Sequence, residues 1–261
     1  MASWDILTTG IDITPKNVLL QLRGVDSWPT EVIYEQLGSP VTDEVYKSSG
    51  GKPDMSAPEY LVKPATFSHV DSKYISEQAL LIDLGEAFLA LSPRINGVGT
   101  PMAYRSPELI LEMKATKASD IWALACTMFE MRSGFPLFES FVGFRTEILK
   151  EMVRILGIPP KPFHALWKQG GITFTDDERP NDSIKDRIRE IGMYDEESSM
   201  YNGDDPSFNP QTLLLEPLGM SITEQESDDL ADLLRRALDY SPEKRLSAEN
   251  VANHHWLLDS Q

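Results

Sequence analysis

Apolar residues at helical spacing predict most of the ordered structure in the second half of the chain. Residues 119–132 (SDIWALACTMFEMR) are apolar almost all round, which is typical of a helix buried at the centre of a domain. Ser119 is expected to cap this helix and Gly134 to end it. Residues 145–156 carry a single apolar stripe and are followed by Gly157, so they predict an amphipathic helix.

Two more helices are predicted near the C-terminus. Thr223 and Glu226 have the spacing of a capping box, which opens a helix. The core stripe expected on that helix consists of Leu230, Leu233, Leu234 and Ala237. Ser247 is expected to cap a last short helix that runs to Trp256.

Two apolar runs in the first third of the chain, residues 17–22 (NVLLQL) and 79–83 (ALLID), predict short strands. Residues 23–78 lie between them and hold five prolines and the sequence SSGGKP, so a loop-rich insert is expected there. Residues 158–222 form a second stretch that is acidic and expected to be irregular. The predicted fold class is mainly α, with a short β-hairpin near the N-terminus.

The excess of acidic over basic residues limits which kinds of binding partner are expected. The 261 residues include 41 acidic and 24 basic side chains, which gives a net charge of −17. Such a surface repels nucleic acid and anionic lipid, so neither is an expected partner, whereas a basic protein is.

Cys126 is the single cysteine, which excludes an internal disulfide and a cysteine-ligated zinc site. No apolar run reaches the roughly 18–20 residues of a membrane span. The N-terminal residues lack a secretion-signal pattern, so cytoplasm or nucleus is the expected compartment.

Three polar residues lie where strands are expected to meet loops. Asp12 precedes Asn17 by five positions, and Asp83 stands two residues before Gly85. Two carboxylates and a carboxamide can hold a hard divalent cation. Phosphoryl transfer needs such a set: one Asp to orient or deprotonate a hydroxyl, and an Asn and an Asp to hold magnesium. An isolated Asp12 or Asp83 motif would more often only cap a turn. The order of the two motifs and the other motifs along the chain therefore decide between turn capping and a metal site.

That order resembles the protein kinases. Five segments match family motifs in the same order along the chain. Asp12-Ile-Thr-Pro-Lys-Asn17 resembles the catalytic loop, Asp83-Leu-Gly85 resembles the Asp-Phe-Gly metal site, and Ser106-Pro-Glu108 resembles the Ala-Pro-Glu motif. Ser119-Asp120-Ile-Trp122 resembles the start of the buried central helix, and Arg245 resembles the arginine that pairs with the Ala-Pro-Glu glutamate. The long spacer between the two Asp motifs and the short activation segment resemble the SR-protein-kinase-like group, especially its fungal members. Those enzymes phosphorylate serine in Arg/Ser-rich proteins.

The resemblance implies roles for the matching residues. Asp12 would be the catalytic base that accepts the proton of the substrate hydroxyl. Asn17 and Asp83 would hold the Mg²⁺ ions that bridge the phosphates of ATP. The expected partner is a protein substrate that is basic and rich in Arg and Ser.

Three further matches imply structural roles. Glu108 and Arg245 would form an ion pair that fixes the activation segment to the helical core. Asp120 would hydrogen-bond the backbone of the catalytic loop.

The sequence also departs from the family pattern. Gly10 stands where kinases have the histidine of His-x-Asp, and Thr14 where many have a lysine. No Gly-rich phosphate loop precedes Asp12, and the Gly-Gly-Lys of residues 50–52 is interpreted as linker. Residues 1–261 are therefore expected to form a kinase C-lobe without the N-lobe, which by itself binds ATP weakly and transfers phosphate poorly or not at all.

Two alternatives stay open at this level. A catalytically dead pseudokinase lobe could act as a binding module for basic segments or for another protein. The chain could also be a truncated gene product. The sequence does not predict an oligomeric state.

Overall fold

The computed structural model describes residues 8–9, 12–65, 67, 70–89, 99–111, 115–140, 143–174, 183–191 and 221–258. The chain divides into two units: an insert unit, Leu19–Leu80, and a helical unit, Met1–Val18 with Leu81–Gln261. The helical unit carries the predicted site residues.

Helix α3 (Lys117–Ser133) is buried on nearly every side, as its sequence predicts. The side chains of Trp122, Ala125 and Phe129 have no accessible surface. The helix begins two residues earlier than expected, so the prediction that Ser119 caps it was wrong. Thr116 is the N-cap, and its backbone N–H donates to Ser119 Oγ at 3.1 Å. Lys117 and Ala118 extend the helix because both have good helix propensity.

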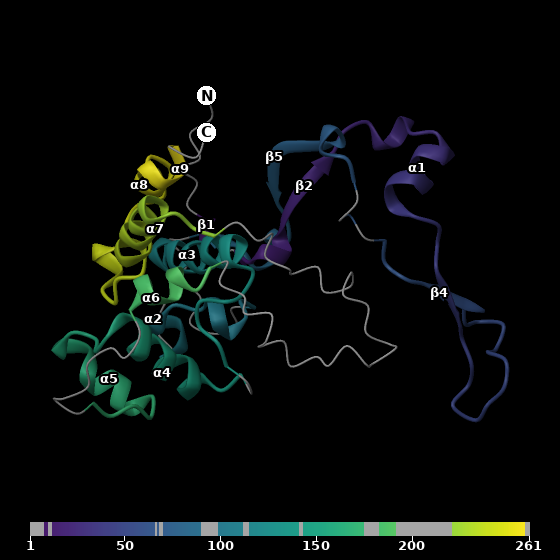
Figure 1. Ribbon diagram of the computed structural model, residues 1–261. Helices are drawn as coiled ribbons and strands as arrows, with labels where there is room; N and C mark the ends of the chain where they lie inside the picture. The colour runs from purple at the N-terminus through teal and green to yellow at the C-terminus, as the bar shows by residue number, and fades with distance from the viewer. Residues whose placement is uncertain are drawn as a thin grey trace. The chain divides into compact units, whose positions relative to one another are not determined.

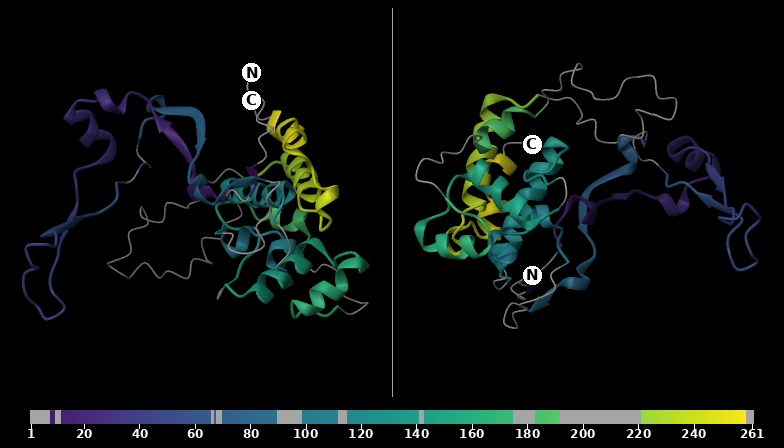
Figure 2. Two further views of the ribbon diagram at one scale, coloured as in Figure 1. Left: turned by 180° about the vertical axis from the view of Figure 1, so that it is seen from behind. Right: turned by 90° about the horizontal axis from the view of Figure 1, so that it is seen from below.

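The two amphipathic helices have the predicted positions. Helix α4 (Arg145–Leu156) buries its apolar stripe. Helix α7 (Glu224–Ala237) contacts α3 and lies beside it (Figures 1 and 2). Thr223 Oγ1 accepts a hydrogen bond from the Glu226 backbone N–H at 3.2 Å, the N-terminal cap that the sequence indicates. Apolar burial of both helices stabilises this unit.

The C-terminal segment forms two helices where one was predicted. Ser247 caps α8 (Ala248–Ala252), and α9 (His255–Leu258) follows. The turn between them buries His254, whose Nε2 lies 3.0 Å from Asp232 Oδ2. This tertiary contact interrupts the helix that the local pattern predicts.

Residues 158–222 contain regular structure that the sequence analysis missed. Helices α5 (His164–Gln169) and α6 (Ile184–Arg189) lie in this stretch, and they bury Trp167, Ile184 and Ile188. Six-residue helices are too short to show a periodic pattern, and such helices form only because the core holds them. Residues 175–182 and 192–220 of this stretch lie outside the described residues.

Short elements complete the helical unit. Helix α2 (Pro107–Ile110) precedes α3, and β1 (Thr8–Thr9) pairs antiparallel with β6 (Phe88–Leu89). None of the helices in the described ranges is long and apolar enough to cross a membrane.

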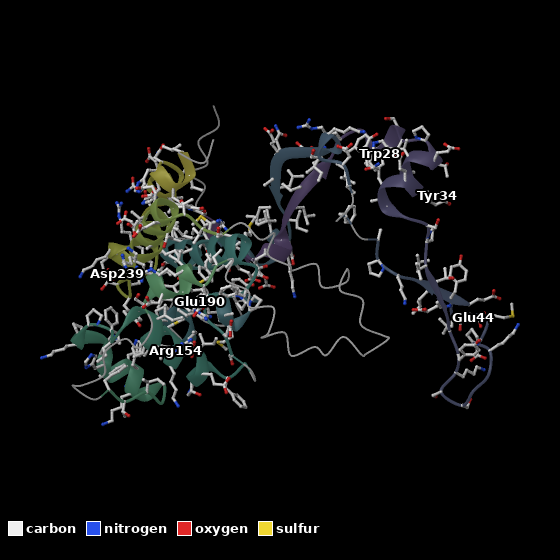
Figure 3. All side chains as sticks on the ribbon, viewed as in Figure 1. Trp28, Tyr34, Glu44, Arg154, Glu190 and Asp239 are labelled. Atoms are coloured by element: carbon white, nitrogen blue, oxygen red, sulfur yellow. The ribbon has the colours of Figure 1, made fainter. Side chains whose placement is uncertain are left out.

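The insert unit is built from short elements and loops. Strand β2 (Val18–Leu22) pairs with β5 (Ile75–Leu81), helix α1 (Thr30–Leu37) follows β2 along the chain, and β3 (Thr42–Glu44) pairs antiparallel with β4 (Tyr60–Val62). Contacts between separate segments of the unit include the packing of Trp28 on Tyr74, with ring centroids 4.7 Å apart, and a hydrogen bond from the Asp71 N–H to Gln36 Oε1 at 2.9 Å. Figure 3 labels Trp28 and Tyr34 in this unit.

Across the described residues, helices and three two-stranded sheets make up the regular structure. This composition agrees with the predicted helical fold with short strands near the N-terminus. The second predicted strand, 79–83, is displaced: β5 ends at Leu81 and leaves Asp83 in the turn that follows.

Candidate active site

The loop from Asp12 to Asn17 turns back on itself. Pro15 occupies the first position of a 3₁₀ turn, Pro15–Asn17, where its missing N–H leaves no bond unmade. The turn returns Asn17 to Asp12, and Asn17 Nδ2 donates to the Asp12 carbonyl oxygen at 2.8 Å and to Asp12 Oδ2 at 3.4 Å. The five-residue spacing in the sequence therefore becomes direct contact.

Asp83 belongs to a segment that is hydrogen-bonded to the loop at Asn17. The Ile82 N–H donates to the Asn17 carbonyl oxygen at 2.9 Å. Asp83 then adopts a left-handed backbone conformation, with φ 60° and ψ 54°, ahead of the 3₁₀ turn Leu84–Glu86. For a residue other than glycine this conformation costs on the order of 1–3 kcal/mol, and such strain clusters at functional sites.

The electrostatics of Asp12 reflect its burial and the charge of Asp83. Its pKa is raised, first by burial and then by the negative charge of Asp83, against the opposing hydrogen bond from Asn17. Asp12 Oδ1 is inaccessible to solvent and has no hydrogen-bond partner among the described residues. The site therefore combines negative potential with an unsatisfied acceptor, both of which a cation would relieve.

Helix α3 supports this loop with residues that the sequence analysis did not identify. Thr127 Oγ1 donates to the Ile13 carbonyl oxygen at 2.8 Å. The Tyr104 hydroxyl donates to the Glu130 carboxylate, and the pKa of Tyr104 is raised by burial, by Glu130 and, more weakly, by the charge of Asp12. The signal in the sequence was the presence of two polar residues, Thr127 and Glu130, in a largely apolar helix.

Glu108 and Arg245, which the sequence analysis pairs, are joined in the structure. Arg245 Nη1 and Nη2 donate to Glu108 Oε1 and Oε2, each at 2.7 Å. Arg245 also donates to the carbonyl oxygens of Asp239 and Ala118, and Ser119 Oγ donates to Glu108 Oε1 at 2.9 Å. The pair thereby connects α2, the start of α3 and the turn that follows α7.

Burial opposes the ionisation of Glu108, yet its pKa lies below the ordinary value because the hydrogen bonds and charge of Arg245 outweigh the burial. The Arg245 guanidinium also lies over the Trp122 ring, 5.0 Å from its centroid. Both contacts favour the charged pair in a dry environment.

Two further features concern the predicted hydrogen bond of Asp120 and the residues that could bind a metal. Asp120 lies half-buried in the first turn of α3, and its hydrogen bond to the catalytic-loop backbone stays a prediction. Within the described ranges, no three His, Cys, Asp or Glu side chains cluster as metal ligands. The candidate ligand set is instead the carboxamide of Asn17 with the carboxylate of Asp83, next to the Asp12 carboxylate.

Comparison with known proteins gives the class. The family described as "Protein kinase domain" matches residues 74–257, a range that includes Asp83, Glu108 and Arg245 but not Asp12 or Asn17. The chain therefore belongs to the protein kinase family.

Individual relatives are kinases too. The chain is 32% identical over 186 residues to "Probable serine/threonine-protein kinase sky1" of Dictyostelium discoideum, which covers 70% of this chain and 25% of the relative. It is 32% identical over 160 residues to "Cyclin-dependent kinase G-1" of Oryza sativa subsp. indica, covering 59% and 18%. It is 27% identical over 195 residues to "Putative serine/threonine-protein kinase L205" of Acanthamoeba polyphaga mimivirus, covering 73% and 32%.

The chain thus spans a third or less of the length of each of these relatives. The similarity to the first agrees with the resemblance to the SR-protein-kinase-like group.

Proposed function

We propose that the chain carries the catalytic loop and metal-binding residues of a serine/threonine protein kinase that transfers the γ-phosphate of ATP to serine. The observation that supports this proposal is the hydrogen-bonded pair of Asp12 and Asn17, whose loop accepts a backbone hydrogen bond from Ile82, the residue before Asp83. Asp12 Oδ1 has no hydrogen-bond partner among the described residues.

The donor set fits magnesium. Asn17 uses its nitrogen on Asp12, so its carboxamide oxygen is the atom left for a cation, and Asp83 supplies a carboxylate. Mg²⁺ prefers such oxygen ligands and is held by few protein groups together with nucleotide phosphates. When bound with ATP, it would neutralise charge on the transferring phosphoryl group.

Asp12 would orient the substrate serine and accept its proton. A carboxylate with a raised pKa is a stronger base than an ordinary aspartate, which suits this role. Asn17 would keep Asp12 in place through its two hydrogen bonds.

The substrate we propose is a basic, Arg/Ser-rich protein segment. The net charge of −17 supports this choice, because opposite charge attracts a basic chain and raises its rate of association. The similarity to the relative named sky1 points to the same group of kinases.

We expect slow turnover from this polypeptide alone. Gly10 and Thr14 replace the histidine and lysine of the family pattern, and Thr14 is buried with 3% of its surface exposed. A buried hydroxyl cannot replace a cation at the phosphates, and positioning is the main source of catalysis in phosphoryl transfer. The same replacements favour a second candidate, a pseudokinase lobe that captures basic segments without catalysis.

One experiment separates these candidates. The chain is incubated with MgATP and an Arg/Ser peptide, beside Asp83→Ala and the charge-matched control Asp54→Ala, whose carboxylate is 76% exposed in an ion pair with Lys47. Phosphorylation that Asp83→Ala abolishes and Asp54→Ala preserves supports the kinase. Peptide binding without turnover supports the pseudokinase, and neither binding nor turnover contradicts both.

A further inference from the structure

A single hydroxyl links helix α3 to the backbone of the catalytic loop. Thr127 is 1% exposed, and its Oγ1 donates to the Ile13 carbonyl oxygen at 2.8 Å, across 114 positions of sequence. In helix interiors a threonine hydroxyl commonly bonds a carbonyl of its own preceding turn. Here the hydroxyl makes a tertiary contact instead, at the loop that carries Asp12.

The bond acts on a short, constrained segment. The Asp12 carbonyl accepts from Asn17 Nδ2 at 2.8 Å, and the next carbonyl, that of Ile13, accepts from Thr127. Each peptide group is planar, so fixing two successive carbonyls fixes the backbone on both sides of Ile13. The direction of the Asp12 side chain follows from the first of these peptide groups.

The same face of α3 supports a second group beside the site. Thr127 and Glu130 are three residues apart and so lie on one side of the helix. Glu130 accepts a hydrogen bond from the Tyr104 hydroxyl, and the charge of Asp12 contributes to the raised pKa of Tyr104. The histidine that would brace the loop in the family pattern is replaced by Gly10, so the loop depends on other contacts.

We propose that Thr127 is a positioning residue, which through the Ile13 carbonyl holds Asp12 and Asn17 in the arrangement that receives a divalent cation with its nucleotide. This inference rests on the proposed function, because it assumes a cation site at Asp12, Asn17 and Asp83. Groups that hydrogen-bond a metal ligand typically contribute about 10–100-fold to metal affinity. Thr127 acts through the backbone beside Asp12 and not on a ligand itself, so an effect at the lower end of that range is expected.

The test compares variants that differ in this hydroxyl. Thr127→Val keeps the shape and removes the donor, and Thr127→Ser keeps the donor. The matched control is Ser133→Ala on the same helix, because the buried Ser133 hydroxyl also donates to a backbone carbonyl, that of Phe135, at 2.8 Å, in the loop that follows α3. Mn²⁺ with ADP is the probe, and its affinity is measured by electron paramagnetic resonance on the full chain.

We expect about tenfold weaker Mn²⁺ binding in Thr127→Val, affinity within about twofold of the unaltered protein in Thr127→Ser, and no change in Ser133→Ala. Amide hydrogen exchange of residues 12–17 is expected to rise in Thr127→Val alone. If Thr127→Val does not fold, Thr127→Cys replaces it, because a thiol is a poor donor of similar size to serine.

The outcomes separate the two proposals. Equal Mn²⁺ affinity in the unaltered protein and Thr127→Val overturns the positioning role and leaves the proposed function standing. Equal losses in Thr127→Val and Ser133→Ala also overturn it, since they would reflect general destabilisation. If the unaltered protein binds no Mn²⁺ with ADP, the proposed metal site fails, and the inference about Thr127 fails with it.

Discussion

Arg245 and Glu108 form a bidentate ion pair inside the helical unit, with both N–O distances at 2.7 Å and side-chain exposures of 0% and 6%. The two residues are 137 positions apart. The pair therefore fixes α2 to the segment that follows α7, and both of its charges are removed from water. A pair of this kind is costly to break one partner at a time.

Replacing Arg245 with alanine is expected to lower the free energy of unfolding by roughly 3–5 kcal/mol, because Glu108 then stays buried with an uncompensated charge. Urea unfolding followed by circular dichroism measures the change. Arg189→Ala is the control: Arg189 pairs with Asp186 at the surface, with exposures of 56% and 50%. An exposed pair contributes about 0–1 kcal/mol, so equal effects of the two variants would contradict a stabilising role for the buried pair.

The same pair predicts how stability depends on pH. The folded pKa of Glu108 is lowered from its ordinary value of 4.5, so its contribution is fully present above pH 4.5 and is lost as the pH falls through the lowered pKa. We expect the stability difference between the unaltered protein and Glu108→Gln to be constant from pH 7 to about 5 and to narrow below about 4.5. A difference that widens in acid would contradict this sign.

Asp12 shows the opposite shift, and Asp83 is one of its causes. The pKa of Asp12 is raised above 3.8 by burial and by the charge of Asp83. Neutralising Asp83 as Asp83→Asn is therefore expected to lower the pKa of Asp12, because the like charge is removed while burial stays. Carboxyl ¹³C chemical shifts in metal-free protein measure this pKa, with Asp54→Asn in the insert unit as the control. An unchanged Asp12 pKa in Asp83→Asn would place the two carboxylates too far apart to share a cation.

The N-cap of α7 offers a local test. Thr223→Ala removes the acceptor for the Glu226 N–H and is expected to cost about 1 kcal/mol, whereas Thr223→Ser keeps the acceptor and is expected to cost less. Thermal unfolding of both variants checks this. Equal losses would mean that the Thr223 methyl group, rather than its oxygen, stabilises the helix.

Local patterns were enough for the longer helices and for the protein class. Helix α4 has both predicted limits and α7 begins where predicted, since each carries an apolar stripe over three or more turns, Gly157 follows α4, and Thr223 caps α7. The ordered motifs predicted the kinase family, which the match over residues 74–257 confirms. Short helices such as α5 and α6 left no such pattern, because six residues span less than two turns.

The sequence by itself determined which residue types are present for phosphate-transfer chemistry and in what order, because motif spacing is a property of the chain. Only the tertiary structure decided that Asp83 lies beside Asn17, that its backbone is left-handed, and that Thr127 supports the loop. These relationships join segments that are distant in sequence. They form through strand pairing and the burial of one helix against a loop. Neither the pairing nor the burial can be predicted from a local pattern of residues.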